Sequence, residues 1–195
     1  MKKICLLLPN GFEAVEASVF TDVIGWNKLQ GDGSTDLVTV GTREKLKCTW
    51  NFTVIPEMHI SEVNVNDFEA LALPGGFEEA GFYDDAYDED VLNLIREFNS
   101  AGKIIASICV GALVVAKSGI LEGRSATTYN LNPIRQKQLA EFGANVMKDQ
   151  PIVIDQNIIT SYNPATAFDV AFMLLELLTS KENCNRVKKL MGFIK

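Results

Sequence analysis

The 195-residue sequence contains a single histidine, His59, and no Cys-x-x-C pair among its four cysteines. Zinc sites usually combine several cysteines and histidines at short spacing, so we expect no metal. A Cys-His-acid triad would have to use His59 itself. That residue stands in "IPEMHISEV", after a hairpin-like segment, and we expect it to have a surface or hydrogen-bonding role.

Long apolar runs are also missing. The first run, Ile4 to Leu8, stops at Pro9 and is too short for a signal-peptide core or a membrane span. We therefore expect a cytoplasmic protein with no membrane partner. The formal net charge of -7 argues against nucleic acid as a partner, because phosphate binding requires a concentrated positive surface.

Without a secretory signal, the cysteines are interpreted as reduced thiols. Cys5 lies in an apolar, strand-like run and is expected in the core. Cys48 and Cys184 have polar neighbours that indicate exposure, and neither has a base nearby. Cys109 is the one thiol whose position in the sequence raises a question about reactivity.

Strand-like and helix-like segments alternate along the chain. Apolar runs predict strands at 2–9, 35–41, 68–76, 103–109 and 125–129, with a strand or hairpin at 47–58 and paired short strands at 151–161. Helical spacing and end signals predict helices at 13–30, 88–102, 111–119, 132–143 and 164–180, with a solvated helix at the basic C-terminus. This alternation is typical of a mostly parallel sheet covered by helices on both faces. No linker interrupts it, so we expect one α/β domain over residues 1–195.

Ligands of open α/β sheets bind beyond the carboxyl ends of the strands. The segments expected there are rich in glycine, proline or short polar residues: 9–16, 73–81, 108–111, 127–132 and 161–166. We therefore place the functional site at this edge.

Cys109 stands at the junction of a predicted strand and a predicted helix in "SICVG". The spacing of small residues around it is that of a nucleophile elbow, on which a reactive side chain is exposed at a sharp turn. The positive end of the following helix favours a thiolate over a thiol. The alternative is a small buried side chain packed under a turn, which is common for free cysteine.

Glu16 lies in the first turn of the helix that follows the first strand, three residues after Glu13. A buried glutamate keeps its proton because desolvation raises its pKa, and the protonated carboxyl can donate a hydrogen bond to a thiolate. Glu13 is interpreted as a partner of the helix dipole. Gly75, Gly76 and Val110 supply backbone amides that we expect to form an oxyanion hole beside Cys109.

The run "EEAGFYDDAYDED", residues 78–90, holds seven acids and no base. Its spacing does not fit a calcium-binding loop. We interpret it as a solvated loop whose last acids favour the start of the helix at 88–100. Phe82 and Tyr83 follow the glycines closely and are candidate walls of the pocket, with Tyr129 and Pro164 from the other strand ends.

Five stretches together resemble the ThiJ/PfpI superfamily, also called the DJ-1/PfpI family, and most closely its DJ-1-like branch: "ICLLLPNGFEAVEAS", "ALALPGG", "IIASICVGALVVAKSGIL", "ATTYNLN" and "IITSYNPATAFDVAFMLLELL". The resemblance implies a flavodoxin-like three-layer sandwich, similar to class I glutamine amidotransferases, and a homodimer with the cysteine near the interface. It also implies that Cys109 is the reactive cysteine, Glu16 its protonated partner, and Gly75 and Val110 the oxyanion donors.

Two positions depart from the family pattern. PfpI-type peptidases have histidine directly after the cysteine, where this chain has Val110. Several DJ-1-like members have a histidine where this chain has Tyr129, and tyrosine is a poor general base at neutral pH. A peptidase is therefore the least favoured function.

The remaining Cys109–Glu16 pair suits addition of the thiol to a small carbonyl substrate, with no cofactor. Family members with similar sites have been credited with glyoxalase, deglycase and hydratase activities, and the missing histidine predicts low turnover. The alternative is a non-enzymatic sensor of oxidants or a chaperone that uses oxidation of Cys109. A third interpretation is an interaction protein with a degenerate site.

Overall fold

A seven-stranded sheet forms the centre of the structure, a computed structural model that describes residues 1–194. The strand order is β10-β11-β7-β6-β1-β2-β5, and all neighbours are parallel except the antiparallel pair β10 and β11. The bounds are β1 (Lys2–Leu8), β2 (Thr35–Gly41), β5 (Met58–His59), β6 (Ala70–Leu73), β7 (Ile104–Ser107), β10 (Ile152–Asp155) and β11 (Ile158–Ser161).

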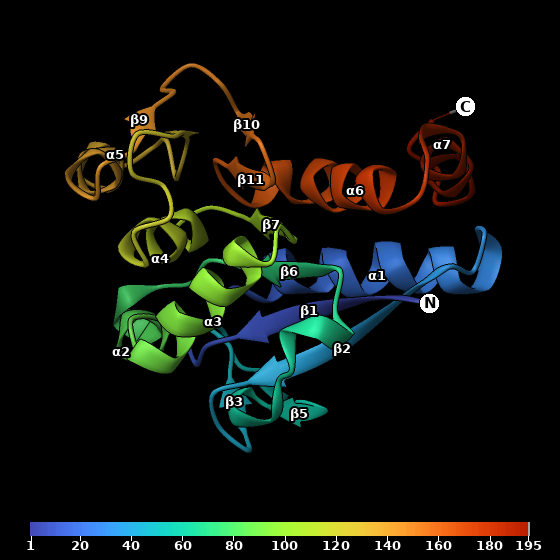
Figure 1. Ribbon diagram of the computed structural model, residues 1–195, viewed down its shortest axis with the longest axis horizontal. Helices are drawn as coiled ribbons and strands as arrows, with labels where there is room; N and C mark the ends of the chain where they lie inside the picture. Colours follow the sequence, from blue (N-terminus) through green and yellow to red (C-terminus); the bar gives the residue numbers. More distant parts are fainter. Residues whose placement is uncertain (195) are drawn as a thin grey trace.

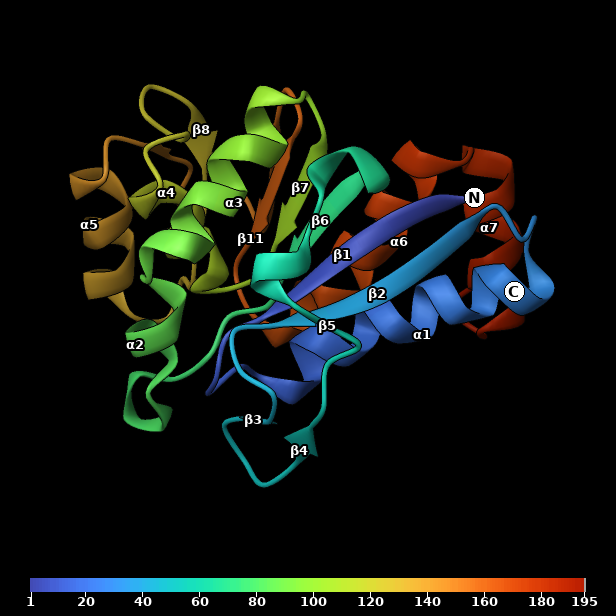
Figure 2. The same ribbon diagram turned by 60° about the horizontal axis from the view of Figure 1, so that its bottom comes forward.

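Helices cover both faces of this sheet (Figures 1 and 2). One face carries α1 (Ala14–Gln30), α6 (Ala167–Leu178) and α7 (Lys181–Leu190), which pack against one another. The other carries α3 (Glu89–Ser100) and α4 (Gly111–Lys117), with α5 (Pro133–Glu141) packed on α4. The expected flavodoxin-like three-layer sandwich is confirmed.

The central strands are continuous apolar runs because both faces of the sheet are covered. Ile4 to Leu8 of β1 and all of β6 are at most 2% exposed. Two of the helices, α1 and α3, begin at capping side chains: Glu13 accepts a hydrogen bond from the amide of Val15, and Asp88 accepts one from the amide of Asp90.

Two predicted segments differ from the sheet elements observed. Of residues 125–129, only β8 (Ser125–Ala126) is a strand, and it pairs with β9 (Asn145–Val146) outside the main sheet. The segment at 47–58 forms the small antiparallel pair β3 (Leu46–Lys47) and β4 (Thr53–Val54), and the main sheet gains β5 just beyond it. Turns of 3-10 helix are η1 (Ile60–Glu62), η2 (Val65–Asp67), η3 (Glu78–Ala80) and η4 (Pro164–Thr166).

The last acids of the run at 78–90 begin a helix, as predicted, with Asp88 as the N-cap of α3. The prediction that the rest of the run is a loop was wrong. The run forms η3, the short helix α2 (Phe82–Ala86) and the start of α3. Asp85 is buried because it pairs with Arg43 and accepts hydrogen bonds from the Thr42 hydroxyl and the Asn10 amide. The acid at this position therefore ties α2 to the loops after β1 and β2.

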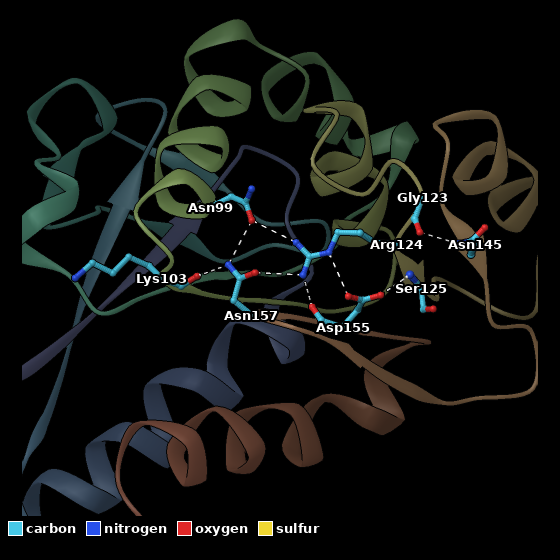
Figure 3. A network of polar contacts seen from close by, with 8 residues as sticks. All are labelled: Asn99, Lys103, Gly123, Arg124, Ser125, Asn145, Asp155 and Asn157. Atoms are coloured by element: carbon cyan, nitrogen blue, oxygen red, sulfur yellow. Dashed lines mark hydrogen bonds and ion pairs between the residues drawn. The ribbon is translucent and has the colours of Figure 1, made fainter.

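At the amino ends of β7 and β11, polar side chains form a network (Figure 3). Arg124 pairs with Asp155 and donates to Asn157 and Asn99. Asn157 in turn donates to the Lys103 carbonyl at 2.7 Å. This network fixes the edge of the sheet opposite to the one where ligands are expected.

Among the residues described, no helix combines the length and the apolar character that a membrane crossing requires.

Candidate active site

The chain leaves neighbouring central strands in opposite directions. The connection after β1 leads through α1 to β2, whereas the connection after β6 leads through α3 to β7 on the other side of β1. Such a reversal leaves a crevice at the carboxyl ends of the strands. The segments after β1, β6 and β7 carry Glu16, Gly75 and Cys109.

Cys109 occupies a strained turn between β7 and α4. Its φ of 56° lies in the left-handed region, which is unfavourable for a side chain larger than glycine. The turn is held by two hydrogen bonds: the Cys109 amide donates to the Ser161 carbonyl at 3.0 Å, and the Thr128 hydroxyl donates to the Cys109 carbonyl at 2.8 Å. The side chain is half-buried. This is the geometry of a nucleophile elbow.

The Glu16 side chain reaches the same turn from the first helical turn of α1 and is fully buried. Its Oε2 accepts a hydrogen bond from the Gly75 amide at 2.7 Å, while Oε1 is buried and has no hydrogen-bond partner within residues 1–194. Desolvation raises the pKa of Glu16 to about 8, although the Gly75 amide acts in the opposite direction. The carboxyl is therefore mainly protonated at neutral pH.

The Cys109 thiol and the Glu16 carboxyl titrate as a coupled pair. Burial raises the pKa of Cys109, and an ionised Glu16 raises it further, whereas the Val110 amide lowers it. A thiolate is therefore less favourable once Glu16 has lost its proton. An ionised Glu16 would leave the buried Oε1 without a donor, so the sulfur, which is partly exposed and faces the Val110 amide, is the better place for a negative charge.

Of the three amides predicted for an oxyanion hole, that of Gly75 is already committed to Glu16 and is not free. The amides of Gly76 and Val110 donate to no carbonyl oxygen in the part of the chain described. Gly75 is required for another reason: a Cβ there would lie 2.9 Å from Glu16 Oε2 and 3.1 Å from the Cys109 Cβ. Its role is to let the glutamate and the cysteine come together.

A cavity of about 410 Å³ opens above the pair. It takes lining residues from all five strand-end segments, and two further side chains come from the β3–β4 turn and from α5. The lining is Glu13, Glu16, Trp50, Gly76, Phe77, Glu78, Glu79, Cys109, Val110, Tyr129, Asn132, Arg135 and Pro164.

Tyr129 and Pro164 lie in this lining, but Phe82 and Tyr83 do not. Phe82 is fully buried beneath Gly76, whose added Cβ would lie 2.4 Å from the phenyl ring. The prediction that it forms a wall was wrong, because α2 turns the ring inward to support the glycine turn. Tyr83 lies behind the wall, with the Arg135 guanidinium 5.2 Å from its ring centre.

The sequence analysis did not find Trp50, Phe77 or Arg135. Trp50 lies in a turn with no motif, and its neighbour Phe77 faces it at 5.2 Å between ring centres. Arg135 could have been predicted as a lining residue, because it lies in the first turn of a predicted helix that follows a strand-end segment. Glu13 caps α1, as expected, but it also lines the cavity and accepts a hydrogen bond from Trp50 Nε1 at 3.0 Å.

Outside the site, His59 is exposed and begins η1, where its ring accepts from the Ser61 amide at 3.3 Å. The polar neighbours of Cys48 and Cys184 were misleading, because both thiols are buried by tertiary packing. Residues 1–194 hold no group of three acidic, histidine or cysteine side chains that could bind a metal ion.

A half-buried elbow cysteine beside a buried glutamate, at the switch point of a flavodoxin-like sheet, defines a class of α/β proteins. A sequence profile of the DJ-1/PfpI family matches residues 2–177, and the chain belongs to that family. It is 30% identical to Protein dj-1beta of Drosophila melanogaster over 96% of this chain and 95% of the relative. The crystal structure of Drosophila DJ-1beta superposes with a TM-score of 0.84 and covers 97% of both chains, at 29% identity.

Two further relatives have names that state an activity. A glutathione-independent glyoxalase of Caenorhabditis elegans is 28% identical over 94% of this chain and 92% of its own length. A deglycase of Pyrococcus horikoshii is 27% identical over 85% of this chain and 93% of its own length.

Proposed function

We propose that this protein acts on small reactive carbonyl compounds, with Cys109 as the nucleophile and Glu16 as the acid–base. The observation that carries the proposal is the convergence of a strained cysteine, a protonated glutamate and two free amides on one cavity. The names of the glyoxalase and the deglycase among the relatives support it.

In the first step, Cys109 loses its thiol proton to water, the thiolate sulfur forms a bond to the aldehyde carbon, and the carbonyl π electrons move to oxygen. The amides of Gly76 and Val110 stabilise that oxyanion, and Glu16 transfers its proton to it, which gives a hemithioacetal. With a pKa of about 8, Glu16 can both give and take a proton near neutral pH. No histidine assists, so we expect slow turnover.

The test is the conversion of methylglyoxal to lactate by purified protein. The Cys109→Ser variant is expected to lose at least about 100-fold in kcat/KM. Cys184→Ser is the matched control, because that thiol is buried on α7 away from the site, and it should retain activity. Equal activity in Cys109→Ser and the wild type would contradict the proposal.

A second candidate function is the sensing of oxidants. A sulfinate at Cys109 would need several hydrogen-bond donors, and the Gly76 and Val110 amides and the protonated Glu16 supply three. Peroxide treatment followed by intact mass should add two oxygens to the wild type and none to Cys109→Ser. Continued oxidation to the sulfonic acid would count against a sensor.

The expected homodimer remains a proposal. Large apolar side chains are exposed along α1 and on the neighbouring β3–β4 turn, among them Val15 at 50%, Leu29 at 80% and Phe52 at 72%. Val15 and Phe52 line one apolar groove, and a second copy of the chain would cover it. Sedimentation of the wild type and of Phe52→Glu tests this, and a monomeric wild type would contradict it.

A further inference from the structure

We propose that one side of the cavity binds a positively charged group, so that the preferred substrates are carbonyl compounds with an ammonium group near the carbonyl. This inference rests on the proposed function, since it places the reacting carbonyl at Cys109. It follows from four residues whose roles the proposed chemistry does not include: Glu13, Trp50, Phe77 and Glu79.

Trp50 and Phe77 form an aromatic corner at the mouth of the cavity. They are 57% and 44% exposed, and their rings meet at 59° with centres 5.2 Å apart. Two exposed aromatic side chains in contact form a small apolar patch, and such patches often mark binding sites. The faces of aromatic rings attract cations, and quaternary ammonium groups are bound in proteins by such corners.

Carboxyl groups flank the corner. Glu13 accepts the indole N–H of Trp50 and so fixes the orientation of the ring. Glu79 lines the cavity and also a neighbouring hollow that Trp50 and Phe77 share. Their negative charge adds to the attraction that the rings exert on a cation.

Arg135, the cation in the lining, does not cancel this charge. Its guanidinium pairs with Glu78 at 2.8 Å, donates to Gln138 at 3.0 Å and lies over the ring of Tyr83. Arg135 and Glu78 therefore neutralise each other. Lys47 lines the neighbouring hollow, so two carboxylates, Glu13 and Glu79, stand against one lysine around the aromatic corner.

The charge of Glu13 also affects the reacting pair. It raises the pKa of both Glu16 and Cys109, and so opposes the thiolate. A cation bound beside Glu13 offsets the negative charge of that carboxylate. The thiolate of Cys109 is therefore favoured when a cationic substrate is bound. Glu16, whose buried Oε1 has no partner within residues 1–194, is one of the lining residues of the same cavity.

The reaction of Cys109 with three methanethiosulfonates that differ in charge tests the inference. In each case the sulfur forms a disulfide and methanesulfinate leaves, so no turnover is required. The reagents carry a trimethylammonium group, a methyl group or a sulfonate. We expect the cationic reagent to react at least about tenfold faster than the anionic one at low salt, relative to their rates with free cysteine.

Variants of the cavity test which residues produce the preference for the cationic reagent. Trp50→Leu and Glu79→Gln should each reduce the preference about threefold or more, whereas Trp50→Phe should restore most of it because a ring face remains. Glu44→Gln is the matched control for Glu79→Gln, since Glu44 is exposed and outside the cavity. It should leave the preference unchanged.

The outcomes separate the two proposals. Equal relative rates for the three reagents, or a preference unaffected by Trp50→Leu and Glu79→Gln, would overturn the cation site while Cys109 remains a nucleophile. No reaction of Cys109 with any reagent, including the neutral one, would contradict the proposed function itself.

Discussion

The two edges of the central sheet differ in whether their buried polar side chains have hydrogen-bond partners. At the amino ends of β7 and β11, the side chains of Arg124, Asp155 and Asn157 pair with one another and with the backbone (Figure 3). The buried side-chain oxygens that lack partners in residues 1–194 lie elsewhere: on Glu16 of α1, on Tyr83 of α2, on Thr127 after β8 and on Ser161 at the carboxyl end of β11.

Unsatisfied buried oxygens cost free energy, and native proteins hold few of them. Here they collect around the residue in the chain's strained elbow, Cys109 with its φ of 56°. We infer that the paired groups at the amino edge contribute to stability, whereas the unpaired groups at the carboxyl edge stay available for a substrate. We also predict that substitutions at the two edges have different consequences.

The largest expected effect is the pH dependence that Glu16 imposes on stability. Its pKa rises from 4.5 to about 8 on folding, so between these values the folded protein holds a proton that the unfolded chain has lost. Stability therefore falls as pH rises through this window, by about 1.4 kcal/mol per pH unit from this group.

Glu16→Gln removes the titration. Relative to the wild type, the variant should gain about 4 kcal/mol in free energy of unfolding between pH 5 and pH 8. Urea unfolding at each pH unit measures this, with the exposed Glu44→Gln as the matched control. Parallel curves for the wild type and Glu16→Gln would show that Glu16 is not held in its protonated form.

A smaller effect is expected at the opposite edge. Arg124→Met removes the cation that pairs with Asp155 and donates to Asn99 and Asn157. Asp155 then keeps only the Ser125 amide as a donor, and its carboxylate loses its ion-pair partner. We expect a loss of about 2 kcal/mol in stability, as measured by urea unfolding. The rate of Cys109 alkylation in the folded variant should not change, and a changed rate would mean that the two edges are coupled.

The smallest effect distinguishes two serines on neighbouring strands. Ser107 on β7 donates its hydroxyl to the Ile159 carbonyl, whereas the hydroxyl of Ser161 on β11 has no partner in the described chain. Ser107→Ala should cost about 1 kcal/mol and Ser161→Ala nothing measurable, by thermal unfolding. A larger loss for Ser161→Ala than for Ser107→Ala would show that the Ser161 hydroxyl is not unpartnered.

The order of strands and helices was predictable because apolar runs and helical spacing are local properties of the sequence. The proximity of Glu16 and Cys109 was also predictable, because the carboxyl ends of parallel strands lie at the same edge of a sheet. The resemblance to the family and the "PGG" turn predicted three backbone donors, Gly75, Gly76 and Val110. The Gly75 amide donates to Glu16 instead, and the other two stay predictions.

The errors concern contacts between distant segments. Asp85 is buried by Arg43, and Phe82 is turned beneath Gly76, although nothing close in sequence indicates either contact. Trp50 reaches the cavity because a two-residue strand pair, β3 and β4, positions its turn beside Phe77. Such placements depend on tertiary packing, which overrides local propensity.

The pH dependence of Cys109 alkylation by iodoacetamide, in the wild type and in Glu16→Gln, tests most directly whether the two residues titrate as a pair. The amide of glutamine keeps the shape and the contact to Gly75, but donates a weaker hydrogen bond to the thiolate than a carboxylic O–H. We predict that the midpoint in Glu16→Gln lies higher than in the wild type by about one pH unit. A midpoint near ~8.5 in both proteins, the value of an ordinary cysteine, would contradict the coupling of Cys109 to Glu16.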